Sequence, residues 1–451
     1  MSSKGDVSLP RAKYIVRRVK AFLILALAAL AIYQTSQLWF VNLANRSLFL
    51  YISARLPAAA SDGYRAFVRP MRLIYGAGDG RFDIRYSGLM DMPPRSYFDT
   101  VLTELFVRGT LESRSETDYE RILSRPVLVF EYAFQMPGSV FPRGFDQRSG
   151  GFLTTRDIET FNSVAIWPPY GDDDCLRVFF IDNDETWEFS IDSATDERFS
   201  LHIPPVSADL PHHVSAVLEG YTDLPPSVFV ARVGELGQFA SYPVIVTNPY
   251  LNHIGETLIL TIRNQVAHFF DNPVTIDSRV AADGVFTFSN IHTTMRYFET
   301  AVLEYISFRP RRQNVASSFM GDFAAALDFI EADDNVVNEL FLAGYEVRRS
   351  DHVFWFGYII GNHPLLMPDG WVVSSPDDIL SAPIEVIVDQ GRVVYYRRLA
   401  YNFNLDYNDH EWVTLEFDNL QGVGNEDITN LRLGYYMRSA RYLRLEWWAT
   451  D

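Results

Sequence analysis

Cysteine is nearly absent from this 451-residue chain, and so is any excess of basic charge. Cys175 is the only cysteine, which excludes an intramolecular disulfide framework and a zinc site built from several thiolates. The net charge of -18 argues against a nucleic-acid-binding protein, because such proteins need a basic face to neutralise phosphates. Three aspartates precede Cys175 and disfavour its thiolate form, so we expect an inert thiol rather than a nucleophile.

Catalytic and cofactor-binding motifs are missing as well. The sequence contains no G-x-S-x-G nucleophile elbow, no phosphate-binding loop and no H-E-x-x-H zinc motif. Gly422-Val423-Gly424 lacks the third glycine of a dinucleotide-binding fingerprint. We therefore expect no enzyme activity, no catalytic residue, no cofactor and no bound metal, and interpret most of the chain as scaffold and binding surface.

Two polar segments are the nearest approach to metal sites. His212 and His213 are adjacent, and neighbouring side chains of a strand point to opposite faces, so surface or capping roles are favoured over zinc binding. A calcium loop starting at Asp182 would need Gly and Glu where the chain has Trp187 and Ser193. The pattern around Asp182 instead predicts an acidic turn between two strands.

What the sequence does contain is an apolar segment behind a basic one. Residues 1–20 carry six basic side chains and one acidic side chain, whereas the 23 residues 21–43 carry no charge. As a helix, residues 21–43 would span roughly 35 Å, against a bilayer hydrocarbon core of about 30 Å. No small-residue cleavage site follows promptly, so an uncleaved transmembrane helix is favoured over a signal peptide.

The flanks of this segment predict its orientation in the cell membrane. Arg17, Arg18 and Lys20 are expected to hold the N-terminus in the cytoplasm, which places the bulk of the chain outside the cell. Tyr33 and Trp39 suit the membrane interface. The predicted localisation is therefore a single-pass membrane protein with an extracellular C-terminal body.

A polar break interrupts the apolar segment. It comprises Gln34, Thr35, Ser36 and Gln37. Amide and hydroxyl groups near hydrocarbon seek hydrogen-bond partners, and Gln34 and Gln37 share a helix face, so contact with a partner helix is one interpretation. The other is that these residues mark the outer membrane interface, where water satisfies them.

The predicted fold class is α+β, with a single N-terminal transmembrane helix followed by a multi-domain ectodomain of antiparallel sheets with packed helices. An aromatic content of 14% favours strand-rich domains. The predicted organisation is as follows: a cytoplasmic basic tail, 1–20; the transmembrane helix, 21–43; a juxtamembrane stalk, 44–62; an N-terminal ectodomain, 63–210; a central α+β domain, 211–310; and a C-terminal α+β domain, 311–451.

Hydrophobic periodicity predicts the main elements of this ectodomain. Helical spacing of apolar residues occurs at 98–106, 254–270 and 316–330. Strands are predicted at residues 126–134, 177–181, 186–191, 285–289, 294–305, 345–349, 354–360, 384–388, 392–399, 412–417, 428–436 and 442–448.

Several of these segments resemble the YycH family of Gram-positive bacteria, single-pass regulators of the WalK sensor histidine kinase. The anchor residues 23–33 followed by Gln37-Leu38-Trp39 are similar to the start of that family. The remaining similar segments are Phe286–Asn290, Met295–Phe298, Leu303–Tyr305, Phe356–Pro364, Ile384–Val386, Gly391–Arg397, Ile428–Tyr435 and Leu445–Trp447, with Glu446 standing where proline is more usual.

This resemblance implies two-component signal transduction that controls cell-wall metabolism. The partners it implies are a WalK-like sensor histidine kinase and a YycI-like co-regulator in the membrane, in a homo- or hetero-oligomer, with no nucleic acid. It carries over no catalytic residues. Two alternatives stay open: an anchored ligand-binding or divisome structural protein of the envelope, and an exported wall hydrolase, which would hold titratable groups in a deep cleft.

Overall fold

The computed structural model describes part of the chain. The described residues are 70–86, 93–138, 158–170, 175–182, 185–192, 199, 212–220, 227–232, 239–250, 256–282, 284–310, 319–333, 335–349, 351–361, 363–367, 370–413, 430–439 and 442–450. By contacts the chain divides into Met1–Ala60 and Ser61–Asp451, and every described residue belongs to the second unit. The predicted span 21–43 lies outside the described residues. Among these residues, no helix has the length and apolar character needed to cross a membrane.

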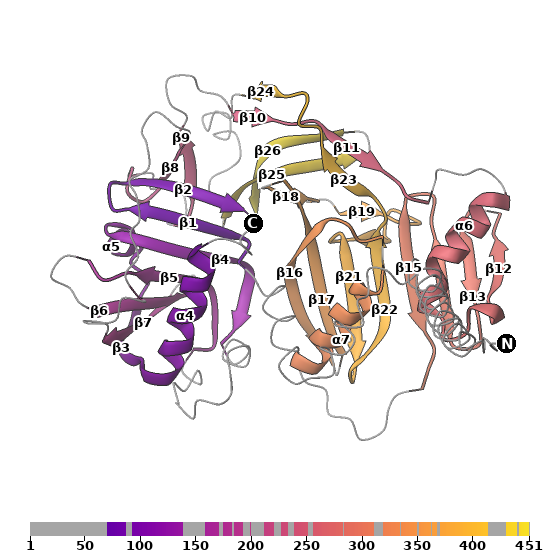
Figure 1. Cartoon of the computed structure of the whole chain (residues 1–451), viewed down its shortest axis with the longest axis horizontal. Helices are drawn as coiled ribbons and strands as arrows, with labels where there is room; N and C mark the ends of the chain where they lie inside the picture. The colour runs from indigo at the N-terminus through magenta and orange to yellow at the C-terminus, as the bar shows by residue number, and fades with distance from the viewer. Residues whose placement is uncertain are drawn as a thin grey trace, which may run out of the picture. The chain divides into compact units, whose positions relative to one another are not determined.

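The first sheet is antiparallel throughout and has nine strands in the part of the chain that is described, in the order β3-β7-β6-β5-β4-β1-β2-β8-β9 (Figure 1). Its strands are β1 Arg72–Ala77, β2 Arg81–Tyr86, β3 Thr110–Glu116, β4 Pro126–Pro137, β5 Thr160–Trp167, β6 Cys175–Ile181, β7 Glu185–Asp192, β8 His212–Ser215 and β9 Phe229–Arg232. The predicted hairpin around Asp182 is confirmed as β6–β7.

Helices α4 (Pro93–Arg108) and α5 (Tyr119–Leu123) pack on this first sheet. The apolar stripe predicted at 98–106 is confirmed as the buried face of α4, where Phe98 stacks on Phe130 of β4 with ring centroids 3.9 Å apart. Helix α5 packs against a second apolar cluster that includes Trp167, whose indole N–H donates to the Ile122 carbonyl at 2.8 Å. Apolar clusters lie on both faces of this sheet, which explains why the sequences of β4, β5 and β6 are almost continuously apolar.

The second sheet contains eleven strands among the described residues. Its order is β12-β13-β14-β15-β22-β21-β17-β18-β25-β26, with β16 paired to β17. All pairs are antiparallel except β18 with β25. The strands are β12 Asp277–Val280, β13 Phe286–Ser289, β14 Thr293–Tyr297, β15 Val302–Ser307, β16 Glu339–Arg348, β17 Asp351–Ile360, β18 His363–Leu366, β21 Ile384–Asp389, β22 Arg392–Leu399, β25 Asn430–Ser439 and β26 Tyr442–Thr450.

Three two-stranded pairs and two further helices complete the described elements. The pairs are β10 (Phe239–Ser241) with β24 (Glu411–Val413), β11 (Val244–Thr247) with β23 (Asn402–Leu405), and β19 (Trp371–Val372) with β20 (Ile379–Leu380). The helices are α6 (Glu256–Val266), followed by the 3₁₀ turns η4 (Ala267–Phe269) and η5 (Pro273–Thr275), and α7 (Phe319–Glu331). The predicted α+β class is confirmed at this level: mostly antiparallel sheets with few helices.

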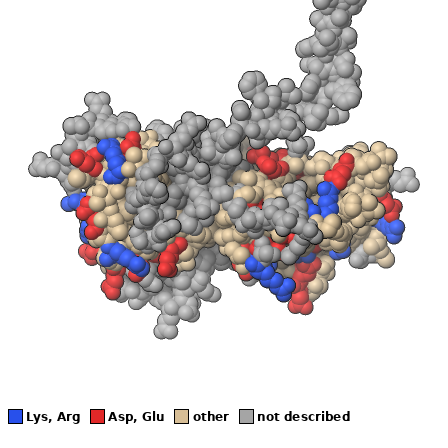
Figure 2. Space-filling model, turned by 90° about the horizontal axis from the view of Figure 1, so that it is seen from below, with Lys and Arg blue, Asp and Glu red and all other residues tan. Residues whose placement is uncertain are grey.

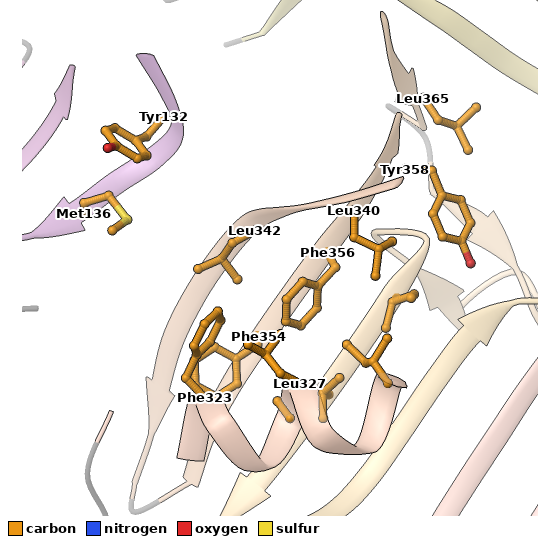
Figure 3. Close-up of a cluster of buried hydrophobic side chains, with 14 of the residues drawn as sticks. Tyr132, Met136, Phe323, Leu327, Leu340, Leu342, Phe354, Phe356, Tyr358 and Leu365 are labelled. Carbon is orange, nitrogen blue, oxygen red and sulfur yellow. The ribbon is translucent and has the colours of Figure 1, made fainter. Parts of the chain in front are cut away.

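Helix α7 covers one face of the second sheet (Figure 1). The stripe predicted within 316–330 is buried, and Figure 3 shows Phe323 and Leu327 pointing towards Phe354 and Phe356 of β17. The ring centroids of Phe323 and Phe354 lie 5.3 Å apart in an edge-on arrangement. Because side chains alternate along a strand, the residues between these phenylalanines face away from α7.

The predicted strand 294–305 is wrong as a single element. It forms two strands, β14 and β15, joined by a tight turn in which the Phe298 N–H donates to the Val302 carbonyl at 2.9 Å. Ala301 takes a φ of 61° in this turn, a left-handed conformation that alanine adopts far less readily than glycine. Without a glycine, the sequence carries no turn signal here. β15 then pairs with β22, across the predicted boundary at 310/311, and the predicted domain boundaries stay a prediction.

A buried polar network lies within the core of the second sheet. The Arg398 side chain is fully buried, and its Nε lies 2.9 Å from Asp333 Oδ2. Arg398 also donates to the Tyr250 hydroxyl at 2.8 Å, and Tyr396 donates to Asp333 at 3.1 Å. Burial alone would lower the pKa of Arg398, but the charge of Asp333 and the neighbouring tyrosine hydroxyl groups together outweigh it and raise that pKa. The network therefore joins the C-terminal end of α7 to β22 and to the segment before α6.

Removing one partner of this pair is predicted to destabilise the fold strongly. Asp333→Ala leaves the Arg398 charge buried without its counter-ion, which costs about 3–5 kcal/mol. The double variant Asp333→Leu/Arg398→Met removes both charges and is expected to cost less than Asp333→Ala. Urea-induced unfolding of the full chain in detergent, followed by tryptophan fluorescence, measures both. A double variant less stable than Asp333→Ala would contradict the account.

Candidate functional site

The site residues predicted from the sequence lie outside the described residues. The structure therefore neither brings them together nor separates them, and their roles stay predictions. They are the helix-contact residues Gln34, Thr35, Ser36 and Gln37, and the orientation and interface residues Arg17, Arg18, Lys20, Tyr33 and Trp39.

Within the described residues, the most organised polar surface is the face of the second sheet that points away from α7. Five residues occupy directly opposed positions on five adjacent strands: Arg296, Glu304, Arg397, Glu385 and Trp355. They belong to β14, β15, β22, β21 and β17 in that order. Opposed residues share a face of the sheet, so these five form one line across it, which we call the charged row.

Glu304 is the centre of the charged row. Its side chain is 2% exposed, and one carboxylate oxygen accepts hydrogen bonds from Arg397 at 2.9 and 3.0 Å and from the Tyr395 hydroxyl at 3.0 Å. Arg296 lies 3.4 Å from the other oxygen. Three hydrogen bonds to one oxygen and an ion pair at the other stabilise the charge of this carboxylate, an arrangement that favours holding strands together over moving a proton.

Arg397 extends the charged row to the segment between β19 and β20. Its Nη1 lies 2.7 Å from Asp378 Oδ1, while Ser374 donates to the other oxygen of Asp378. Burial alone would raise the pKa of Asp378, but the hydrogen bonds from Ser374 and Arg397 outweigh it and lower that pKa. Trp371 donates its indole N–H to the Thr300 carbonyl at 2.8 Å, so the segment is fixed at two points.

Glu385 has a different environment from Glu304, although both oppose Arg397. Burial raises the pKa of Glu385, and the charge of Arg397 offsets this only in part. Beside it on β17, Trp355 carries the Arg348 guanidinium over its ring at 5.5 Å from the centroid. This end of the charged row therefore combines a partly buried carboxyl group with an aromatic surface, both suited to binding.

The sequence carried a signal for these residues that the prediction missed. Glu304 stands between Leu303 and Tyr305, and Glu385 between Ile384 and Val386. Each glutamate is therefore a single charge whose apolar neighbours point to the opposite face of the strand. That pattern predicts a half-buried carboxylate. Which arginine opposes it depends on strand order and register, and these follow from pairings far apart in the chain.

The predicted role of His212 and His213 was a surface or capping one, and the surface part is wrong, since both side chains are buried in β8. Burial, supplemented by the charge of Arg72, lowers the pKa of His213 to about 3. Burial also lowers the pKa of His363, the first residue of β18, to about 4. Their predicted failure to bind zinc stays a prediction. Among the described residues, no group of three or more His, Cys, Asp or Glu side chains could hold a metal ion.

The other polar segments are structural in character. Asp182 accepts hydrogen bonds from Gln135 at 2.8 Å and from Thr160 at 2.6 Å, so it ties the β6–β7 turn to β4 and β5. Asp118 caps α5 by accepting from the Arg121 N–H at 2.9 Å. The open hollow beside α5, of about 650 Å³, is lined by residues 115–121 and Val217. On the face drawn in Figure 2, acidic and basic side chains of the described residues are interspersed.

Comparisons with known proteins show similarity of fold. No protein-family model matches the chain, and no curated protein matches it. The fold is similar to the crystal structure of YycH from Bacillus subtilis, with a TM-score of 0.45 and 10% sequence identity over 85% of this chain and 93% of that chain. A crystal structure of an uncharacterized protein from Eubacterium rectale aligns with a TM-score of 0.30 and 10% identity, over 47% of this chain and 76% of that chain.

The two carboxylates of the charged row are predicted to differ in how much stability is lost when each is replaced by glutamine. Glu304→Gln removes a charge that holds two arginines and a tyrosine, so we expect a loss of about 2–3 kcal/mol in the free energy of unfolding. Glu385→Gln removes a charge that burial disfavours, so stability at pH 7 should stay within about 0.5 kcal/mol of the unaltered chain. Urea unfolding of the two variants side by side measures this. Equal losses would contradict the different roles assigned to them.

The buried histidines predict a loss of stability in mild acid. Their native pKa values lie below the unfolded value of 6.5, so the unfolded chain binds protons first as the pH falls. Each histidine then contributes a loss of about 1.4 kcal/mol per pH unit below 6.5, continuing towards its native pKa. Unfolding measured at pH 7 and pH 5 should show this, and His213→Gln should reduce the difference. The exposed His410→Gln variant is the control. An unchanged difference in His213→Gln would contradict the assignment.

Proposed function

We propose that this chain is a bitopic, non-enzymatic regulator of a sensor histidine kinase that controls cell-wall metabolism. In this proposal, residues 21–43 cross the cell membrane with the N-terminus in the cytoplasm, and the two sheets form the extracellular body. Its partners are a WalK-like kinase and a YycI-like co-regulator, contacted through the membrane helix and through the body.

One observation supports this proposal above the others. The described segments that resemble the YycH family are spread over about 160 residues of sequence, yet they fall within one sheet. They lie in β13, β14, β15, β22, β21, β17, β18, β25 and β26, which follow one another in that sheet without interruption. This arrangement supports the proposal, because segments that belong to one conserved structural unit are expected to lie in adjacent strands.

The chemistry of the described residues is compatible with a binding function. Glu304 accepts three hydrogen bonds and forms an ion pair with Arg296, and the charged row ends in the half-buried side chains of Glu385 and Trp355. A protein-binding surface of this type combines a partly desolvated charge with an aromatic side chain. The end of the charged row formed by Glu385 and Trp355 is therefore the place at which we propose that the body contacts its membrane partners.

The proposed mechanism is a coupling free energy between the body and the membrane. Binding or assembly of the body shifts how helix 21–43 packs against the kinase helices, and so biases the kinase between two signalling states. Gln34 and Gln37 are the proposed contacts, with Thr35 and Ser36 in support. An interhelical hydrogen bond in a membrane contributes about 0.6 kcal/mol on average, so one such bond shifts a balanced equilibrium about threefold and two shift it about eightfold.

Replacing Gln34 and Gln37 by leucine is predicted to change kinase output by about three- to eightfold. The reason is that leucine cannot form interhelical hydrogen bonds. Phosphorylation of the kinase and its response regulator in cells measures the effect, with the membrane level of the variant determined in parallel. Gln34→Asn/Gln37→Asn keeps both amides and is the matched control. Unaltered phosphorylation at normal membrane level would remove the helix contact, and co-purification with division proteins would then favour the envelope alternative.

A further inference from the structure

Three large apolar side chains protrude into solvent at one end of the second sheet. Val274 and Ile291 are each 85% exposed, and Phe308 is 61% exposed. Val274 lies in η5, just before β12, Ile291 lies in the turn between β13 and β14, and Phe308 follows β15. We call these three residues the apolar tip.

The strand register brings these three residues to the same end of the sheet. Asp277 of β12 opposes Ser289 of β13, and Thr293 of β14 opposes Ser307 of β15. The residues that flank these pairs therefore lie close together at the end of the sheet. The Phe308 N–H donates to the His292 carbonyl at 2.8 Å, which places Phe308 against the turn that carries Ile291. An ion pair between Arg309 and Asp271 joins the same place to the segment before Val274.

Hydrogen bonds hold the apolar tip in this exposed position. The Asn290 side chain accepts from the N–H groups of His292 and Thr293 at 2.9 and 2.8 Å, which fixes the turn with Ile291 at its apex. The Asn272 side chain accepts from the Val274 N–H at 3.1 Å and fixes the second turn in the same way. Closed turns of this kind leave the apolar side chains no route to fold back onto the core.

Exposed apolar side chains that cluster on one surface indicate a site that binds a protein or a membrane. These three stand on separate turns and protrude, so they form neither a groove nor a flat patch. A protein partner would need pockets shaped to receive them, whereas a fluid bilayer closes around protruding side chains. The form of the apolar tip therefore favours lipid as its occupant.

Charge near the apolar tip agrees with a lipid surface. Arg392 donates to the Arg309 carbonyl at 3.1 Å, so its guanidinium group lies at the backbone of the residue that follows Phe308. Asp271 forms an ion pair with Arg309, and Asp389, which opposes Arg392 in the strand ladder, is buried. Cationic side chains at the border of an apolar insertion bind the phosphates of lipid headgroups. The whole chain is strongly acidic, with a net charge of -18, which makes two neighbouring arginines distinctive.

The chain itself brings the apolar tip within reach of a bilayer. Residues 44–69 lie between the predicted span and the first described residue, and 26 residues can extend to at most roughly 90 Å. A tethered surface meets the membrane at high effective concentration, so a weak contact of three side chains is sufficient.

We infer that the apolar tip inserts Val274, Ile291 and Phe308 into the outer leaflet of the membrane that anchors the chain, with Arg309 and Arg392 at the level of the lipid phosphates. This inference rests on the anchor in the proposed function. It adds a second attachment to the bilayer, formed by the second sheet. Two attachments restrict how the body can turn on the membrane, and so fix which surface it presents to a partner.

An environment-sensitive fluorophore at Ile291 tests the inference. The full chain carrying Cys175→Ser and Ile291→Cys is labelled and reconstituted into vesicles of phosphatidylcholine with phosphatidylglycerol, with and without nitroxide-labelled lipid. A matched control carries the label at Val337, which is 60% exposed and precedes β16 at the other end of the sheet. We expect a blue-shifted emission at 291 and quenching about twofold or more above that at 337.

Two further arms separate the possible outcomes. Val274→Ser/Phe308→Ser should reduce quenching at 291, and omission of phosphatidylglycerol should weaken it, because Arg309 and Arg392 then lose their anionic partners. Flotation of the chain with vesicles reports the anchor independently of the label. Flotation with a label at 291 as water-exposed as the label at 337 would overturn the apolar tip and leave the proposed function intact. A chain that does not float would overturn both. A label that is buried only after the kinase is added would identify a protein-docking site instead and would also overturn the inference.

Discussion

The antiparallel pairing of β15 with β22 sets the two faces of the second sheet. In this register Glu304 opposes Arg397, Tyr305 opposes Tyr396 and Leu303 opposes Arg398. The first pair lies on the face away from α7 and forms the centre of the charged row, while Tyr396 and Arg398 lie in the core. A slip of one residue would bring Glu304 into the core and expose Tyr305, because successive side chains alternate between faces. Burial of the aromatic core and satisfaction of the buried carboxylate thus specify the same register.

Each face satisfies its buried charges in its own way. In the core, Arg398 is balanced by Asp333 and by tyrosine hydroxyl groups, which fixes α7 relative to β22. On the other face, Arg397 joins Glu304 to Asp378 and so fixes the segment between β19 and β20. Adjacent arginines of one strand therefore hold different layers of the molecule to the same sheet. A body stabilised in this way can transmit a contact at one place as a change of orientation, as the proposed function requires.

The local pattern of apolar and polar residues was sufficient to predict those helices and strands whose hydrophobic periodicity is strong. The apolar stripes of α4 and α7 and the runs of β4, β17, β21 and β22 were all predicted, because side-chain periodicity alone distinguishes a buried face. The β14–β15 turn was missed because Ala301 takes a conformation that usually signals glycine. Burial of His212 and His213 was missed because it arises from packing around β8 rather than from β8 itself.

The charged row depends on pairings between residues up to 93 positions apart, such as Glu304 with Arg397, which periodicity does not encode. The residues proposed to contact the kinase lie outside the described part of the chain, so their roles remain predictions from sequence.

The central claim is that helix 21–43 stays in the bilayer as a recognition element for a kinase. Photocrosslinking from positions 34 and 37 in living cells tests this most directly, with crosslinked partners identified by mass spectrometry. The account predicts a crosslink from these positions to a transmembrane helix of a sensor histidine kinase, and a weaker crosslink from Ile32 and Trp39, which lie on the opposite face of the helix. A mature chain released by cleavage after the apolar segment would contradict it, and so would crosslinks from positions 34 and 37 to lipid alone.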